Sequence, residues 1–114
     1  IRPADANEVK GAWQAALRFQ GPTAIVLSRQ NLPTLSYTDR HFKEGVGRGA
    51  YILKDTEGTP DYTLFATGSE VSLALSVMKE LELLDKHVRV ISFPCWEIFE
   101  EQDAAYKEKS SGET

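Results

Sequence analysis

The segment "TAIVLSRQNLP", residues 23–33, places an arginine directly after an apolar run. Thr23 to Ser28 is short, apolar and partly β-branched, which is typical of a strand covered on both faces of a parallel sheet. Ligands of open α/β sheets bind at the carboxyl ends of such strands, where Arg29 stands. Its planar guanidinium suits a carboxylate or a phosphate. The residues alone leave a second interpretation equally open, in which Arg29 caps a helix end or pairs with a surface acid.

A second candidate is the stretch "ATGSEVS", in which Gly68 and Ser69 follow a predicted strand and open a predicted helix. The unpaired N–H groups and the dipole at the start of a helix attract anions. However, the chain has neither a G-x-G-x-x-G pattern nor the lysine of a P-loop. We therefore interpret this stretch as a tight turn, in which Ser69 caps the helix and Glu70 interacts favourably with the dipole.

The histidines and the cysteine suggest no further chemistry. His41 and His87 have no cysteine, histidine or carboxylate at ligand spacing, so we expect no metal site. Cys95 has no base near it in the sequence, and we interpret it as a small buried thiol rather than a nucleophile. The acidic stretch "EIFEEQD" lacks the spacing of a calcium loop and is typical of a solvated helix face.

Composition excludes several classes of protein. The 114 residues are 41% hydrophobic and 26% charged, and the net charge is -4, so there is no basic surplus that would indicate nucleic acid as a partner. No apolar run approaches the roughly 18–20 residues of a membrane span. The single cysteine excludes an internal disulfide and fits a reducing compartment, so we expect a cytoplasmic protein. Because the chain starts at Ile1 and ends in the polar "SSGET", we expect a piece of a longer protein.

The elements that must position Arg29 begin with a helix over residues 5–19. Asp5 is the expected N-cap, and Glu8, three residues later, completes a capping-box pattern. Helical spacing predicts one buried apolar stripe, and Gly21-Pro22 ends the helix before the predicted strand. The stripe consists of Val9, Ala12, Trp13, Ala16 and Leu17.

Residues 31–49 lose all periodicity, and we interpret them as an interdomain linker, because loops of this length are uncommon inside one compact domain. Beyond them the pattern predicts strand, strand, helix, strand and helix, which gives an α/β unit with a βαβ element. The predicted strands are 50–55 (an edge strand), 62–67 and 87–93, and the predicted helices are 68–86 and 96–109. Apolar spacing places Val71, Ala74, Leu75, Met78, Leu81 and Leu84 on the buried face of the first of these helices, and Trp96, Ile98 and Phe99 are expected to be partly buried.

Several motifs, taken in order, resemble the transketolase family. They are "RPADANEV", "LSRQNLP", "YIL", "ATGSEVSLAL", "VRVISFPCWEIFEEQ" and "YKE", and they extend from Ile1 to about Glu108. The combination of "RPAD", "SRQNLP" and "ATGSEV" is highly specific. The sequence departs from the family at "KSSGET", where a transketolase would continue through its C-terminal domain.

The resemblance implies a division of the chain. Residues 1–30 would be the last helix and strand of the pyrimidine-binding domain, and residues 31–49 the interdomain linker. Residues 50–114 would be the start of the C-terminal domain, a mostly parallel sheet with flanking helices. The fold class expected is thus α/β, with a truncated C-terminal unit.

The resemblance also implies a function for the parent protein. Transketolases transfer a two-carbon ketol unit from a ketose phosphate to an aldose phosphate in the pentose phosphate pathway. They act as homodimers that use thiamine diphosphate and a divalent metal, Mg²⁺ or Ca²⁺. The family's arginine in "S-R-Q" binds the substrate phosphate, and Arg29 is at that position. Ser28, Gln30 and Asn31 are interpreted as supports of the turn.

The family's catalytic and cofactor-binding residues have no counterpart in this sequence. Its "GDG" stretch, its proton-transfer histidines and its cofactor-activating glutamate are absent, so we expect no catalytic, cofactor-binding or metal-binding residue here. Two hypotheses stay open. The chain is either part of a transketolase that functions only in the complete dimer, or a non-catalytic interaction or anion-binding module of the same fold.

Overall fold

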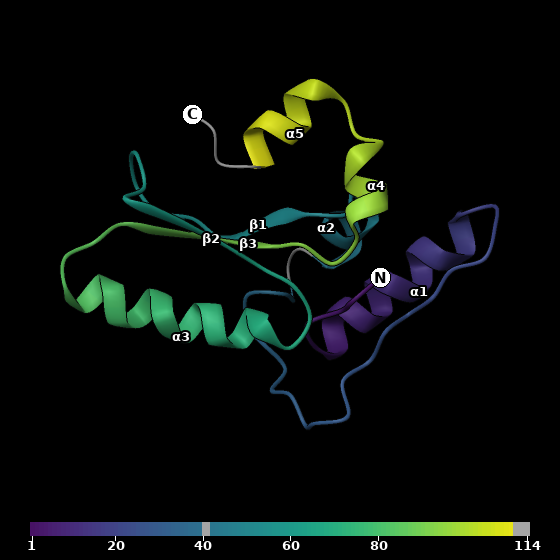
Figure 1. Cartoon of the computed structure of the whole chain (residues 1–114), viewed down its shortest axis with the longest axis horizontal. Helices are drawn as coiled ribbons and strands as arrows, with labels where there is room; N and C mark the ends of the chain where they lie inside the picture. Colours follow the sequence, from purple (N-terminus) through teal and green to yellow (C-terminus); the bar gives the residue numbers. More distant parts are fainter. Residues whose placement is uncertain (40–41, 111–114) are drawn as a thin grey trace.

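The computed structural model describes residues 1–39 and 42–110, whose centre is a three-stranded sheet (Figure 1). Strands β1 (Tyr51–Lys54), β2 (Tyr62–Ala66) and β3 (Val88–Ser92) lie in the order β1-β3-β2. β2 is parallel to β3, and β1 is antiparallel to it. The predicted α/β class is therefore confirmed, with the parallel pairing confined to β2 and β3, and β1 is the edge strand that was expected.

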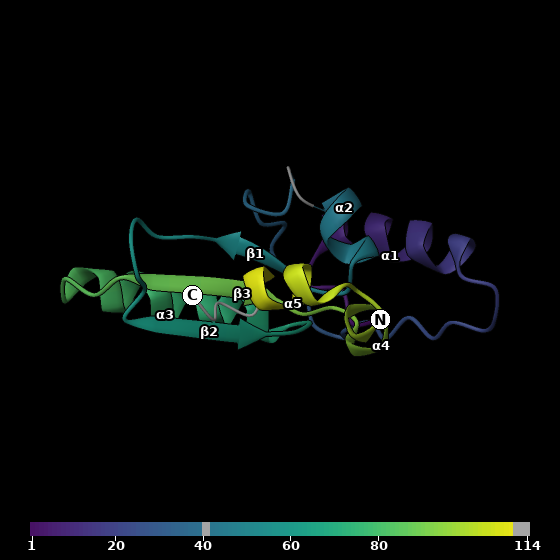
Figure 2. The ribbon, with the colours of Figure 1, turned by 90° about the horizontal axis from the view of Figure 1, so that it is seen from above.

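Helices cover both faces of the sheet. Helix α3 (Glu70–Leu83) lies on one face, and α4 (Trp96–Glu100) and α5 (Ala104–Ser110) lie on the other (Figure 1). The central strand β3 runs between the other two (Figure 2) and is buried at every residue, because it has strands on both sides and helices on both faces. Its Val88 and Val90 join the core beneath α3, while Ile91 packs with Ala50 and Phe99 under α4.

The buried face of α3 agrees with the prediction for all but one residue. Val71, Ala74, Leu75 and Met78 are buried, and Leu81 packs against the same core. Leu84 is exposed, so its predicted burial is wrong. The helix ends at Leu83, and the chain turns away at Asp85, whose φ is +60°.

Helix α1 (Ala6–Arg18) begins as predicted, since the Asp5 carboxylate accepts the Glu8 N–H at 2.9 Å. Its predicted buried stripe is partly wrong. Ala12 is buried, but Trp13 and Leu17 are 58% and 82% exposed. The face that packs instead contains Gly11, which approaches α2 (Phe42–Gly47) so closely that a Cβ there would lie 2.5 Å from the Phe42 carbonyl oxygen.

The predicted strand over residues 23–28 does not form. Among the described residues its backbone pairs only with Ile1, whose carbonyl accepts the Val26 N–H and whose NH₃⁺ group donates to the Ala24 carbonyl, both at 2.8 Å. This is the pattern of one residue of parallel pairing, and a strand needs a longer neighbour to form a ladder. The segment is extended and largely exposed, and Ile25 alone within it packs against the core.

Two other predictions are corrected. Residues 31–49 are not loop throughout, because α2 forms within them and packs against α1. The single helix predicted for 96–109 is two helices: α4 stops at Glu100, and the Asp103 carboxylate accepts the Tyr106 N–H at 2.7 Å, which caps the start of α5. Trp96, expected to be partly buried, is 65% exposed, whereas Phe99 is buried and Ile98 half-buried.

Candidate functional site

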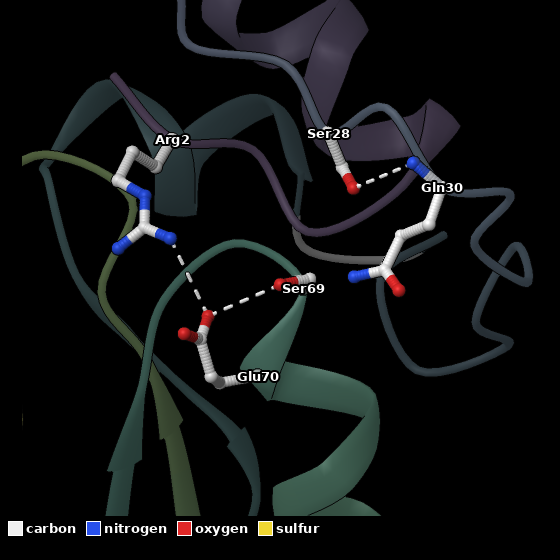
Figure 3. A network of polar contacts seen from close by, with 5 residues as sticks. All are labelled: Arg2, Ser28, Gln30, Ser69 and Glu70. Carbon is white, nitrogen blue, oxygen red and sulfur yellow. Dashed lines mark hydrogen bonds and ion pairs between the residues drawn. The ribbon is translucent and has the colours of Figure 1, made fainter.

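Arg29 lies on an exposed turn at the end of the extended segment. The Ser28 hydroxyl oxygen accepts the backbone N–H of Gln30 at 3.2 Å, so the two residues that flank Arg29 are bonded to each other (Figure 3). A serine that bonds the backbone two residues later fixes a local turn without a regular element. This is the kind of support that we expected from Ser28 and Gln30. Asn31 is exposed, and the structure shows no specific role for it.

The residues that hold this segment against the α/β unit come from the start of the chain. Arg2 donates its backbone N–H to the Pro94 carbonyl just after β3, at 2.7 Å. Its guanidinium reaches Glu70 Oε2 at 3.4 Å, at the first turn of α3 (Figure 3). With the pairing between Ile1 and residues 24–26, residues 1 and 2 therefore bridge the Arg29 segment and the carboxyl ends of β2 and β3.

The turn that precedes α3 is tight, as predicted, because Gly68 has a φ of +59° that few side chains tolerate. Ser69 is the N-cap residue of α3, as predicted, but its side chain makes no capping hydrogen bond to the helix backbone. Ser69 has helical φ and ψ, and its hydroxyl donates instead to Glu70 Oε2 at 3.3 Å. The Arg2 guanidinium lies over Gly68, and together with Ser69 it occupies Glu70 rather than leaving this turn open to an anion.

Two buried carboxyl groups, Asp5 and Glu8, connect the start of α1 to the rest of the structure. Asp5 Oδ2 accepts the Leu35 N–H at 2.8 Å and the Thr38 hydroxyl at 2.5 Å. Glu8 Oε2 accepts the hydroxyls of Tyr51 and Ser92, both at 2.6 Å, and its Oε1 accepts the Ala4 N–H at 3.0 Å. The capping box is thus only half formed, because Glu8 bonds the backbone one residue before the N-cap and otherwise reaches the sheet.

Glu8 is fully buried, and the Ala4 N–H and the two hydroxyls that donate to it are neutral groups. Burial raises the pKa of its carboxyl, because desolvation outweighs the opposing hydrogen bonds from Ser92, Tyr51 and Ala4. The neighbouring Asp5 carboxyl acts in the same direction. Burial, followed by the charge of Glu8, also raises the pKa of Tyr51. This pair thus favours uncharged forms and serves to join α1 to β1 and β3.

A cleft of about 840 Å³ lies at the carboxyl ends of β2 and β3. Arg2 and Glu70 lie on its wall with the aromatic rings of Phe65, Phe93 and Trp96. The rings of Phe93 and Trp96 stack with 5.0 Å between centroids. Arg29 is not among the lining residues, so the structure does not bring the predicted site residue to the cleft.

The remaining candidates keep their structural roles. Cys95 is buried, as predicted, and its Sγ lies 3.5 Å from Glu97 Oε2. His87 Nδ1 lies 3.3 Å from the Thr56 hydroxyl, and His41 lies outside the described residues. Within residues 1–39 and 42–110, no three His, Cys, Asp or Glu side chains gather where they could hold a metal ion. Across the same residues, no helix is both long and apolar enough to span a bilayer.

Sequence reasoning missed the contacts made by Arg2, Glu8 and Thr38. Glu8 was recognised only as a capping residue, because local spacing carries no information about Tyr51 and Ser92, which are 43 and 84 residues away. Arg2 was visible only as part of a motif. The one available signal for these contacts was Glu8 itself, an acidic residue on the face of α1 that is buried in the structure.

Two family models match the chain. The model described as "Transketolase-like TK C-terminal domain" matches residues 49–113, and "Transketolase, pyrimidine binding domain" matches residues 1–34. A transketolase of Staphylococcus epidermidis is 53% identical over 109 residues, which cover 95% of this chain and 16% of that protein. A transketolase of Aquifex aeolicus is 51% identical over 108 residues, with coverage of 94% and 16%.

Solved structures agree with this relationship. Transketolase from Leishmania mexicana superposes with a TM-score of 0.88 at 40% identity, over 96% of this chain and 16% of that one. A Pichia stipitis transketolase, solved in complex with sedoheptulose-7-phosphate, gives a TM-score of 0.85 at 36% identity with the same coverage. The chain thus spans 16% of the length of these relatives, and it belongs to the transketolase family.

Proposed function

We propose that this chain is part of a transketolase that transfers a two-carbon ketol unit between ketose and aldose sugar phosphates, and that Arg29 binds the substrate phosphate. The observation that carries the proposal is an exposed guanidinium on a turn closed by its two neighbours, Ser28 and Gln30. The relative of Pichia stipitis was solved with a sugar phosphate, which supports this class of substrate.

We propose the division of the chain that the resemblance implied. Residues 1–30 belong to the end of a pyrimidine-binding domain, residues 31–49 to the connection, and residues 50–114 to the start of a C-terminal domain. The two family matches, over residues 1–34 and 49–113, support it. In the structure the first part docks on the last through Glu8, Tyr51 and Ser92.

Thiamine diphosphate with Mg²⁺ or Ca²⁺ is the cofactor that we propose for the complete protein, which we expect to be a cytoplasmic homodimer. When bound, the cofactor supplies the carbanion chemistry. The described residues do not fit its metal, since they offer no suitable group of three His, Cys, Asp or Glu side chains. Because the family's "GDG" stretch, proton-transfer histidines and cofactor-activating glutamate have no counterpart in this sequence, we assign no catalytic, cofactor or metal role to this chain, and expect the 114 residues alone to transfer no ketol unit.

Arg29 acts on the end of the sugar that is remote from the reacting carbons. It holds the phosphate, and thereby orients the carbon chain toward the reaction centre. A bidentate guanidinium supplies both charge and direction for this task. The contribution is made in the ground state and in the transition state alike, so it belongs mainly to KM.

The test is Arg29→Ala in the full-length enzyme. A hydrogen bond to a charged group contributes roughly 1.5–3 kcal/mol, so kcat/KM for a ketose phosphate should fall roughly 10- to 100-fold. Hydroxypyruvate, a donor without phosphate, should be nearly unaffected. Arg29→Lys should recover part of the loss, because it keeps the charge without the fork.

Arg18→Ala is the matched control, because Arg18 is also exposed and lies in the last turn of α1. It should leave both donors unchanged. Equal losses on both donors in Arg29→Ala would mean that Arg29 supports the fold or the cofactor. The phosphate assignment would then be wrong, although the family membership would stand.

A further inference from the structure

We propose that Asp5 and Thr38 are positioning residues for the Arg29 loop, which we define as residues 20–34. They act by holding together the two segments of chain that flank this loop, which we call its stem. The inference rests on the proposed role of Arg29, since a loop that bound no substrate would need no such placement.

The stem is closed by one carboxylate. The loop begins directly after Phe19, the C-cap of α1, and Leu35 is the first residue after the loop. Asp5, at the other end of α1, accepts the Glu8 N–H with Oδ1 and the Leu35 N–H with Oδ2, at 2.9 and 2.8 Å. The residue that starts the helix before the loop thus also holds the first residue after it.

Thr38 reinforces this closure. Its hydroxyl donates to Asp5 Oδ2 at 2.5 Å and accepts the side-chain N–H of Asn7 at 3.0 Å. Thr38 is fully buried and Asp5 is 5% exposed. A polar group buried this far is costly unless it is hydrogen-bonded, so the bonds at Asp5 and Thr38 favour a single geometry.

The loop itself has few contacts that could fix it. Its residues are exposed except for Ile25 and Leu32. Its hydrogen bonds within the described part of the chain are the two with Ile1, the one from the Gly21 N–H to the Phe19 carbonyl, and the one that closes the Ser28–Gln30 turn. The stem, in contrast, is attached to the core, because Glu8 of helix α1 accepts hydrogen bonds from Tyr51 and Ser92 of the sheet. The placement of Arg29 therefore depends on the bonds made at the base of the loop together with the pairing of residues 24–26 to Ile1.

The test compares two substitutions in the full-length enzyme. Thr38→Val keeps the shape of the side chain but removes the hydroxyl, and Thr38→Ser keeps the hydroxyl. Loss of one neutral hydrogen bond corresponds to about a fivefold change. We expect Thr38→Val to raise KM for a ketose phosphate about fivefold and to leave hydroxypyruvate unchanged, and Thr38→Ser to restore most of the affinity. Thr59→Val, at an exposed threonine in the β1–β2 connection, should change neither donor.

The outcomes separate this inference from the proposed function. If Arg29→Ala is selective for the phosphorylated donor and Thr38→Val is not, the positioning role is wrong and the phosphate role stands. If Arg29→Ala is not selective, both are wrong. Hydrogen exchange of the unsubstituted enzyme tests the stem without any variant: the Leu35 N–H should exchange more slowly than those of Thr34 and Ser36. Equally fast exchange at Leu35 would overturn the inference even if Thr38→Val did not fold.

Discussion

The Tyr51 hydroxyl in β1 donates a 2.6 Å hydrogen bond to the Glu8 carboxyl group of α1, a residue 43 positions earlier in the chain. Ser92 of β3 donates to the same oxygen at the same distance. Helix α1 is thereby attached to two strands of the sheet at one buried carboxyl group. Removing Tyr51 or Ser92 as a partner would leave Glu8 buried with one hydrogen bond fewer, which costs about 1–3 kcal/mol of stability.

The first prediction concerns the pH dependence of this attachment. Burial raises the pKa of Glu8 in the folded chain, so the folded state binds its proton more tightly than the unfolded state. The stabilising contribution of protonation is therefore complete below the unfolded pKa and is lost as pH rises through the folded pKa. Glu8→Gln has no group that titrates at this position. Its free energy of unfolding should therefore fall less with rising pH than that of the unsubstituted chain, which we call the parent here.

Urea unfolding of the parent and of Glu8→Gln at several pH values measures this difference. The titratable groups that face Glu8 are Asp5 and Tyr51, and Tyr51→Phe provides a control that keeps the carboxyl. Tyr51→Phe should weaken the fold and should keep a fall of stability with rising pH at least as steep as that of the parent, because it removes a hydrogen bond that lowers the pKa of Glu8. Identical pH slopes in the parent and in Glu8→Gln would show that Glu8 titrates in the folded chain as it does in the unfolded chain.

The second prediction concerns Gly49, which lies where the chain enters β1. A Cβ there would lie 2.3 Å from the Phe99 N and 2.4 Å from the Cys95 carbonyl oxygen, both in backbone, and its φ is +89°. Gly49→Ala should therefore cost about 2–5 kcal/mol, from the clash and the backbone strain together. Gly58→Ala is the matched control, because Gly58 has a φ of +73° but nothing within 4 Å.

Gly58→Ala should cost only the strain, about 1–2 kcal/mol. Urea midpoints of the two variants give the comparison. Equal losses of stability in the two variants would mean that the backbone of Phe99 and Cys95 moves away from the added methyl group at position 49 without cost.

The third prediction concerns Cys95. Burial raises the pKa of its thiol, and the nearby Glu97 carboxylate acts in the same direction. Because the thiolate is the reactive form, alkylation by iodoacetamide at pH 8 should be much slower in the folded chain than in urea. The rate should rise as pH is increased. As this is the only cysteine of the chain, mass spectrometry reads its modification directly, and equal rates in the two solvents would contradict a buried, protonated thiol.

The sequence predicted best those elements whose signal is local and whose neighbours are also nearby. Helix α3 and strand β3 form as expected, because each has an apolar pattern that the adjacent β2 and α4 cover. Asp5 was correctly predicted as an N-cap for the same reason: the bond that defines a cap reaches only three residues.

The failures share a cause, which is that a pattern does not say what will cover it. Trp13 and Leu17 form a regular helical stripe, yet both stay mostly exposed in the described part of the chain. Residues 23–28 have strand composition, but their pairing is confined to Ile1. At the candidate site, Arg29 could be selected from its position, whereas the stem bonds of Asp5 to Leu35 and Thr38 could not, because they join residues 30 and 33 positions apart.

The last prediction follows from those uncovered side chains. Leu17 is 82% exposed and Leu27 is 61% exposed, and the extended segment between them presents backbone groups beyond its pairing with Ile1. An uncovered extended segment with apolar side chains favours association with another chain. We expect the isolated 114-residue chain to self-associate with increasing concentration, as measured by sedimentation velocity.

Leu17→Lys should shift this association to higher concentration, because it replaces an exposed apolar group with a charge. Gln20→Lys adds the same charge at an exposed polar position between Leu17 and Leu27 and controls for the change in net charge. If both variants shift the association equally, net charge rather than the Leu17 surface governs it. If the parent sediments as a monomer at every concentration, these side chains do not mediate association.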